Sequence, residues 1–241
     1  MNILQSHEMQ EGDGVTVRRL FPFHRQHLVA DPFVLWDDFT IGSDAGFPTH
    51  AHRGFESITY LFECSMNHAD NLGNDSTVKA GGAQRFTAGT GIQHSEMPGD
   101  DGPASGIQLW INLPRSLKTI APDYQQVDAA DIPEHTENGV SVREIVGEHS
   151  PLELKTRVHY AEIRMDANSR YTLEVDDELQ GILYLQAGTA MANDARLETG
   201  TALQLKAGDE VSIQATGNAR LMLALGKPHN EAVMLNGGFV D

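Results

Sequence analysis

The 241-residue sequence contains a single cysteine, Cys64, so the chain cannot form a disulfide bond within itself. Nothing in it depends on an oxidising compartment, and we expect a reduced, cytoplasmic location. The first residues, MNILQSHEMQEGDG, lack the basic segment and apolar run of a secretory signal. No later apolar stretch approaches the roughly 20 residues of a membrane-spanning helix. These absences predict a soluble protein without a targeting segment.

Basic residues are also scarce: 17 Lys and Arg stand against 34 Asp and Glu, for a formal charge of −17. Such a surface repels phosphate backbones and anionic lipids, so we expect no direct nucleic-acid binding and no membrane binding. A strongly acidic composition most often means only a well-solvated surface. It allows a protein partner but gives no positive sign of one.

Helical periodicity over a dozen residues is scarce, whereas short runs of β-branched and aromatic residues recur between Gly, Asn and Asp. In the first half we expect strands at residues 57–62 and 106–113. The polar segment 68–75 is interpreted as a turn that leads to a return strand at 77–79, which makes a hairpin. The pattern predicts an all-β protein.

Residues 114–151 differ in composition, with four prolines and scattered charges around a short strand at 141–146. This segment is the best candidate for a connection between two β units. The turn 207–209 is expected to join two strands of the second unit as a hairpin. The strands expected beyond the connection lie at residues 158–165, 181–186, 202–206, 210–214 and 220–225.

Two histidines, His50 and His52, flank one residue in a segment with strand character. Side chains two apart share a face of a strand, so both imidazoles would point inward, and Glu56 shares their parity if no bulge intervenes. Downstream, His94 and Glu96 repeat the arrangement. Antiparallel pairing of the two strands would bring imidazoles and a carboxylate together, a set of ligands that suits divalent transition metals.

The segments GFPTHAHRGFE and TAGTGIQHSEMP, which contain these histidines, resemble the two motifs of the pirins, bicupin proteins of the cupin superfamily. The glycines that open and close the general first cupin motif are not matched. Gly46 lies too close to His50, and Cys64 stands near the position of the closing glycine. The resemblance extends over the whole chain, from the N-terminal pattern around Gly12 to the tail that ends near Val240.

The resemblance implies two cupin-type β-barrel domains of jelly-roll form in tandem, which we place at residues 1–128 and 129–241. It also implies that the second barrel has no metal site. In the first barrel, substitution of His68 is expected to have little effect, because His68 lies in the expected turn. Glu56 occupies the position of the general cupin glutamate, so it remains an alternative acidic ligand or a partner that orients an imidazole. The metal ligands that the resemblance implies are His50, His52, His94 and Glu96.

The resemblance to bacterial pirins further implies an oxidoreductase of the quercetin 2,3-dioxygenase type. Its cofactor would be one divalent metal, Fe(II) first and Ni, Mn, Co, Cu or Zn as alternatives, and its substrates a small aromatic molecule and dioxygen. Glu96 or Glu56 would accept the substrate's hydroxyl proton, and Phe47, Phe55 and Trp110 would line an apolar mouth. The alternative function is that of a redox-sensing, metal-dependent regulatory protein, like the eukaryotic pirins that act as transcriptional cofactors.

Overall fold

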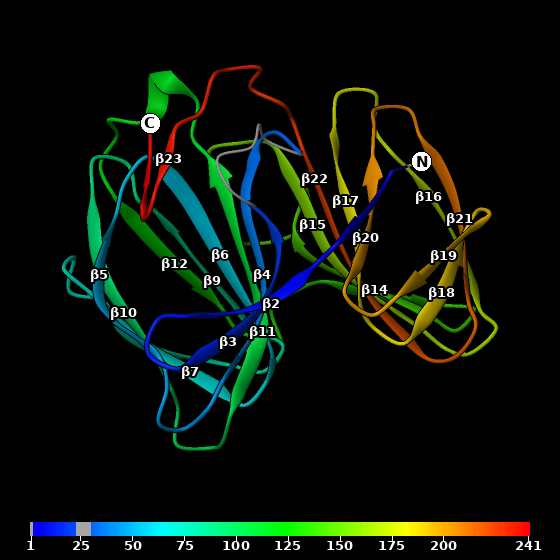
Figure 1. Cartoon of the computed structure of the whole chain (residues 1–241), viewed down its shortest axis with the longest axis horizontal. Helices are drawn as coiled ribbons and strands as arrows, with labels where there is room; N and C mark the ends of the chain where they lie inside the picture. The colour runs from blue at the N-terminus through cyan, green and yellow to red at the C-terminus, as the bar shows by residue number, and fades with distance from the viewer. Residues whose placement is uncertain (1, 23–29) are drawn as a thin grey trace.

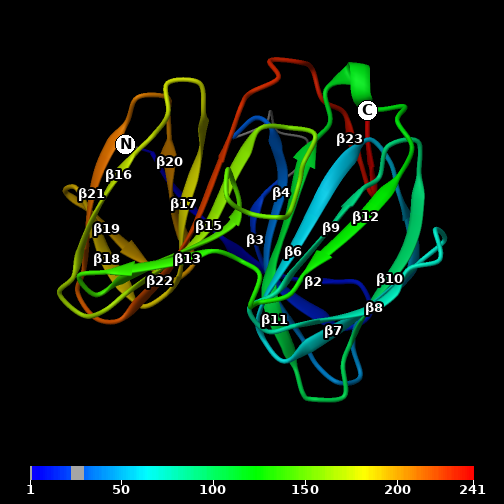
Figure 2. The same ribbon diagram turned by 180° about the vertical axis from the view of Figure 1, so that it is seen from behind.

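A computed structural model describes residues 2–22 and 30–241 of the chain. Two β units lie side by side, as opposite views of the molecule show (Figures 1 and 2). Each unit consists of one large sheet of seven strands and one small sheet of four. The predicted all-β class is confirmed, since the only helical element described is the single 3-10 turn η1 (Arg115–Leu117). Within the described residues no helix is long and apolar enough to cross a membrane.

The first unit is formed by strands from the first half of the chain, and all its pairings are antiparallel. Across its large sheet the strands are, in order, β12 (Asp123–Val127), β9 (Ala83–Thr87), β6 (Phe55–Glu63), β11 (Ala104–Asn112), β4 (Phe33–Ile41), β3 (Val15–Phe21) and β2 (His7–Glu11). Across its small sheet they are β5 (Phe47–His52), β10 (Ile92–Pro98), β7 (Ser65–Asp70) and β8 (Asp75–Lys79).

The second unit repeats this layout. Across its large sheet the strands are β13 (Glu134–Glu137), β14 (Val140–Val146), β15 (Val158–Met165), β22 (Ala219–Gly226), β17 (Gln180–Ala187), β20 (Thr201–Leu205) and β1 (Ile3–Gln5). Across its small sheet they are β16 (Arg170–Glu174), β21 (Glu210–Ala215), β18 (Thr189–Ala192) and β19 (Ala195–Glu198). A short hairpin of β23 (Leu235–Asn236) and β24 (Phe239–Val240) follows.

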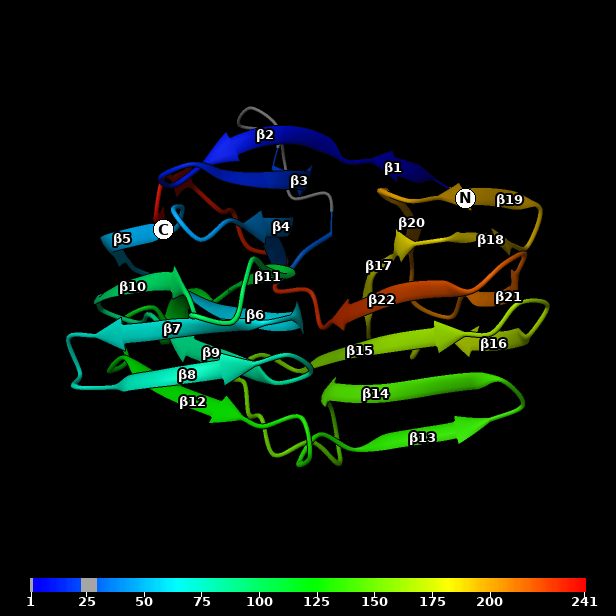
Figure 3. The ribbon, with the colours of Figure 1, turned by 90° about the horizontal axis from the view of Figure 1, so that it is seen from below.

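The two large sheets face each other across a shared apolar core, in which Trp36 packs against Tyr160 and Tyr184. Two hydrogen bonds cross this core, from the Tyr60 hydroxyl to Glu162 (2.9 Å) and from the Tyr184 hydroxyl to Asp38 (2.9 Å). The small sheets lie on the outer sides. Seen from below, the strands of the first unit lie on the left and those of the second unit on the right (Figure 3).

Both ends of the chain cross between the units. Strand β1 pairs with β20 of the second unit, with Ile3 opposite Leu203. At the other end, Phe239 bridges to Arg53 of the first unit, so the C-terminus lies against the first unit and the N-terminus against the second (Figure 1). The chain changes sheets between β12 and β13, the stretch that contains the expected boundary at 128/129.

Two hairpins that the sequence predicted are wrong in their pairing. Residues 57–62 belong to β6, which ends before Cys64, a residue with a positive φ of 56°. The chain then starts a separate strand, β7, which pairs with β8. The segment 207–209 joins β20 of the large sheet to β21 of the small sheet, two strands that do not pair. In both places a tight turn moves the chain between sheets.

Candidate metal centre

Strands β5 and β10 pair antiparallel, as the sequence predicted, with His94 opposite His50 and Ile92 opposite His52. One irregularity in this register falls between His94 and Glu96. The alternation along β5 places His50 and His52 on the same face, and β10 brings His94 beside them. This local pairing assembles the three imidazoles from segments about forty residues apart.

The three imidazoles are close enough to share one ion. One ring nitrogen from each of His50, His52 and His94 lies within 4.8 Å of the others. Ring centroids are 4.5 Å apart for His50 and His94, and 5.1 Å apart for His52 and His94. His52 and His94 are only 5% and 1% exposed.

Two of the rings are oriented by backbone carbonyls. His50 donates its Nδ1 hydrogen to the carbonyl of Pro48 (2.8 Å), and His52 donates its Nδ1 hydrogen to the carbonyl of Gly238 (3.2 Å). A neutral imidazole that donates through Nδ1 keeps a lone pair on Nε2, which is the tautomer that binds a metal through Nε2. Neither ring nitrogen of His94 has a hydrogen-bond partner among the described residues. A buried, unpartnered imidazole beside two oriented ones fits a bound cation.

Burial keeps these rings uncharged. Burial first, and the neighbouring imidazoles second, lower the pKa of His52 to about 3 and that of His94 to about 2. At neutral pH His52 and His94 therefore carry free lone pairs, without a proton that an incoming cation would have to displace.

Glu96 lies deeper in the same cavity and is 1% exposed. Its Oε1 accepts hydrogen bonds from Thr59 (3.1 Å) and Gln84 (2.7 Å), and its Oε2 accepts one from Gln108 (2.9 Å). A carboxylate offers about four lone-pair sites, so one on Oε2 stays open. A carboxylate oxygen of Glu96 groups within 4.8 Å of His94 and His68 but not with His50 and His52.

Glu56 does not lie where its sequence parity placed it. The chain turns at Gly54 (φ +84°) after β5, and β6 continues in the other sheet of the unit, so the parity count from His52 is broken. The buried carboxylate of Glu56 accepts hydrogen bonds from the Thr87 hydroxyl (2.7 Å) and the Lys155 backbone (2.9 Å). Burial raises the pKa of Glu56, and these hydrogen bonds oppose that rise. Glu56 belongs to neither group of potential metal ligands.

His68 is the residue that the sequence reading missed. It lies within β7, not in a turn, and is fully buried, so the reason for expecting it to matter little is wrong. Its ring stacks on Tyr124 with centroids 4.3 Å apart, and lies 5.3 Å from the ring of His94. The alternation of His68 with Asp70 was the available signal, but the polar composition of that segment favoured a turn.

The two strands that carry the three histidines, β5 and β10, border a cavity of about 720 Å³, whose lining includes His50, His52 and Glu96. Phe47 and Trp110 contribute to its lining, as expected, while Phe55 is fully buried and stacks on Trp110 with centroids 4.2 Å apart. The C-terminal hairpin completes one wall through Leu235 and Gly238. Gln84 and Gln108, which fix Glu96, and the carbonyl of Gly238, which fixes His52, could not be identified from any sequence motif.

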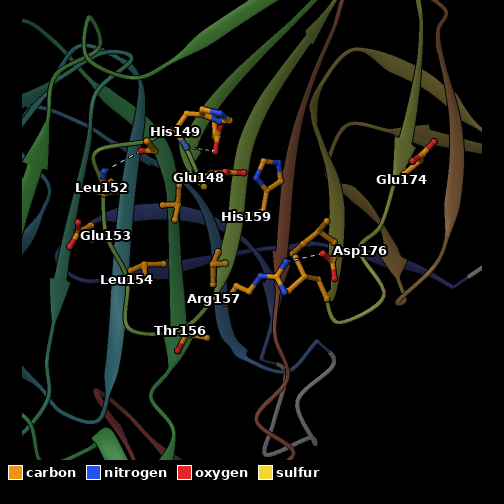
Figure 4. A pocket seen from close by; sticks show the side chains of 17 residues that line it. Glu148, His149, Leu152, Glu153, Leu154, Thr156, Arg157, His159, Glu174 and Asp176 are labelled. Atoms are coloured by element: carbon orange, nitrogen blue, oxygen red, sulfur yellow. Dashed lines mark hydrogen bonds and ion pairs between the residues drawn. The ribbon is translucent and has the colours of Figure 1, made fainter.

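A second cavity, of about 850 Å³, lies around the start of β15 (Figure 4). Two ion pairs lie in its lining: Arg157 with Asp176 (2.8 Å), and His149 with Glu144 (3.1 Å). No group of three potential metal ligands is found there among the described residues. Although this cavity is larger, both groups of potential metal ligands among the described residues lie in the first unit.

Family models match both units. The pirin model covers residues 14–111, and the model of the pirin C-terminal cupin domain covers residues 160–241. This chain belongs to the pirin family. The two-domain cupin fold expected from the sequence is thereby confirmed.

Other pirins are similar over nearly the whole of this chain. Pirin of Mus musculus is 37% identical over 249 residues, which cover 98% of this chain and 84% of the relative. A pirin-like protein of Solanum lycopersicum is 36% identical over 240 residues, with 95% and 82% coverage. Among solved structures, a quercetin 2,3-dioxygenase from Acinetobacter baumannii superposes with a TM-score of 0.91 at 29% identity, covering 100% of this pirin and 90% of that chain.

Proposed function

We propose that this protein is a metal-dependent dioxygenase that opens the heterocyclic ring of flavonols, an activity of the quercetin 2,3-dioxygenase type. The observation that carries the proposal is the convergence of His50, His52 and His94, of which His50 and His52 line a cavity of about 720 Å³ that is partly lined by aromatic side chains. Cavities of this size with a few convergent polar groups are typical of small-molecule sites. The similarity to a solved quercetin 2,3-dioxygenase supports the same reading.

The ion would be held by the three histidines together with Glu96, and Fe(II) is our first choice of metal. Imidazole and carboxylate ligands suit several divalent transition metals, so the supply in the cell decides between them. When bound, the metal supplies a Lewis acid for an enolic hydroxyl and a redox-active centre for dioxygen. The unpartnered nitrogens of His94 and the open lone pair of Glu96 fit this role.

The protein's own groups would bind the flavonol and remove its proton. Glu96 would accept the proton of the 3-hydroxyl on Oε2 by giving up its contact to the ion, because Oε1 already accepts from Thr59 and Gln84 whereas Oε2 accepts only from Gln108. Gln108 donates to Oε2 and itself accepts the indole hydrogen of Trp110 (3.0 Å), which fixes the orientation of the carboxylate. Phe47 and Trp110 offer aromatic faces to a flat substrate.

The overall reaction consumes one dioxygen per flavonol. Both oxygen atoms enter the ring-opened ester, and one ring carbon leaves as carbon monoxide with its own oxygen. Atoms and electrons balance without an external reductant. A small aromatic molecule and dioxygen are therefore the only substrates that the proposal requires.

The test is anaerobic addition of quercetin to iron-loaded protein, followed by oxygen. We expect a shift of the flavonol absorption band before oxygen is admitted, then bleaching, with oxygen consumed and carbon monoxide released in equal amounts. His159→Ala serves as the control variant, because His159 lines the other cavity. If protein loaded with Fe, Mn, Co, Ni or Cu in turn never bleaches quercetin, the dioxygenase function is wrong.

A further inference from the structure

Two neighbouring buried imidazoles have ring nitrogens that lack hydrogen-bond partners. Nδ1 of His68 and both nitrogens of His94 are without a partner among the described residues. The side chains are 0% and 1% exposed, so these nitrogens are not in contact with bulk solvent. Unpaired buried polar atoms are unfavourable and rare, and each calls for an explanation. An ion shared with His50 and His52 explains only one of the two nitrogens of His94.

The other nitrogen of His68 is held by Asp70. The carboxylate of Asp70 accepts hydrogen bonds from the backbone of Leu72 (2.9 Å) and from the backbone and side chain of Asn74 (3.0 and 2.8 Å). It also lies 3.1 Å from Nε2 of His68. Because an ionised carboxylate can only accept, Nε2 of His68 must carry the hydrogen. In the neutral ring Nδ1 is then an acceptor.

The position of His94 makes it the donor for this acceptor. Its ring lies between that of His50, at 4.5 Å, and that of His68, at 5.3 Å. A nitrogen of His94 lies within 4.8 Å of one of His68, so the two rings are neighbours, and a hydrogen bond between them requires these nitrogens to move closer. Three of the lone pairs of Glu96, the other acceptor nearby, are already used by Thr59, Gln84 and Gln108.

We propose that Asp70 and His68 are positioning residues for the metal centre, with His68 accepting a hydrogen bond from Nδ1 of His94. The relay runs from Asp70 through His68 to His94 and leaves Nε2 of His94 free for the ion. The stack of His68 on Tyr124 fixes the plane of its ring. His94 thus obtains from a side-chain pair what His50 and His52 obtain from backbone carbonyls. This inference rests on the metal site of the proposed function, but not on the identity of the substrate.

The first test needs no metal. Long-range ¹H–¹⁵N spectra of the metal-free protein report which nitrogen of each histidine carries the hydrogen. We expect hydrogen on Nδ1 of His94 and on Nε2 of His68. Hydrogen on Nε2 of His94, or on Nδ1 of His68, would overturn the proposal.

The second test measures metal affinity by chelator competition and the visible spectrum of the cobalt-loaded protein. His68→Phe keeps the ring that stacks on Tyr124 but removes both nitrogens, so we expect affinity to fall about 10- to 100-fold with a changed spectrum. His68→Gln restores an acceptor and should recover most of the loss. The control, His159→Phe, replaces a histidine outside the cavity and should bind as the wild type does.

Several outcomes separate this proposal from others. Wild-type affinity in His68→Phe, or equal weakening in His68→Gln, would overturn it, the latter indicating direct ligation or packing. If His68→Phe does not fold, the tautomers of the wild type and the affinity of His68→Gln decide. If the wild type leaves quercetin intact but the tautomers and affinities are as expected, only the dioxygenase function fails.

Discussion

The two units share one layout and differ in what their interiors contain. In both, a four-stranded sheet covers a seven-stranded one, and β5 and β10 of the first unit correspond in sheet order to β16 and β21 of the second. In the first unit this pair of strands carries the three histidines and Glu96. In the second, the buried residues of the pair are Leu173, Val211, Ile213 and Ala215.

The difference shows how one backbone design serves two purposes. The interior of the second unit contains an apolar cluster of residues between Val140 and Leu225, which gains stability from burial. The first unit buries imidazoles and carboxylates, and it must hold each with hydrogen bonds or an ion. The second unit therefore contributes core packing, while the first contains the potential metal ligands.

The largest expected effect is on metal affinity, when a buried histidine of the first unit is replaced by an apolar residue like those inside the second unit. His94→Ala removes the buried imidazole that lies in both groups of potential ligands, so we expect metal affinity to fall by about 100-fold or more, beyond the loss from removing a partner of a ligand. Flavonol bleaching should disappear. Metal content after chelator dialysis and circular dichroism check binding and fold. Undiminished metal content would show that the histidine cluster is not the metal site.

Shortening a buried side chain of the second unit should lower the stability of the fold but leave metal affinity unchanged. Leu221 is fully buried, so Leu221→Ala should lower the free energy of unfolding by about 2–5 kcal/mol through lost burial and a cavity. Metal affinity per folded molecule should stay within twofold of the wild type. Urea unfolding and chelator competition measure the two quantities. A large change in affinity would show that the interiors are coupled more tightly than the layout indicates.

The buried histidines of the first unit should make the stability of the fold depend on pH, whereas the apolar cluster of the second unit should not. The pKa values of His52 and His94 fall from 6.5 in the unfolded chain to about 3 and about 2 in the folded one. Below pH 6.5 these two histidines are protonated in the unfolded chain but stay neutral in the folded one. The free energy of unfolding therefore falls by about 1.4 kcal/mol per pH unit for each histidine, until the pH reaches its pKa in the folded state.

The measurement compares metal-free wild type with His94→Gln by urea unfolding between pH 6 and pH 4. The variant should lose stability less steeply, by about 1.4 kcal/mol per pH unit. Leu221→Ala should keep the wild-type slope, because its site contains no titratable group. Equal slopes in wild type and His94→Gln would mean that His94 is not held neutral by burial.

The smallest effect is expected at Glu56. Glu56→Gln places an amide among the donors of Thr87, Lys155 and Thr156, which should cost about 1–3 kcal/mol of stability. Metal affinity should stay within twofold, whereas Glu96→Gln should weaken it tenfold or more, about 1.4 kcal/mol. Chelator competition on both variants compares them directly. Weakened binding in Glu56→Gln alone would restore Glu56 as the acidic ligand.

The sequence was most informative where period-two alternation acts alone. The histidines of β5 and β10 could be placed on one face because alternation within a strand needs no knowledge of the rest of the fold. The parity of Glu56 failed because the left-handed turn at Gly54 moves the chain into another sheet. Alternation cannot be counted across such a turn.

The hydrogen-bond partners of Glu96 could not be predicted from the sequence, for a different reason. Gln84 and Gln108 reach Glu96 from two other strands, and which strands neighbour one another is set by the packing of the whole sheet. His68 was misplaced because Cys64 adopts a left-handed conformation and starts a new strand where a polar turn was expected.

The carbonyl that orients His52 belongs to Gly238, 186 residues later in the chain. A ribosome therefore synthesises the last part of the cavity wall long after the three histidines have emerged. His52 gains the acceptor that fixes its tautomer only after Gly238 has been synthesised. Completion of this histidine cluster therefore depends on the C-terminal hairpin.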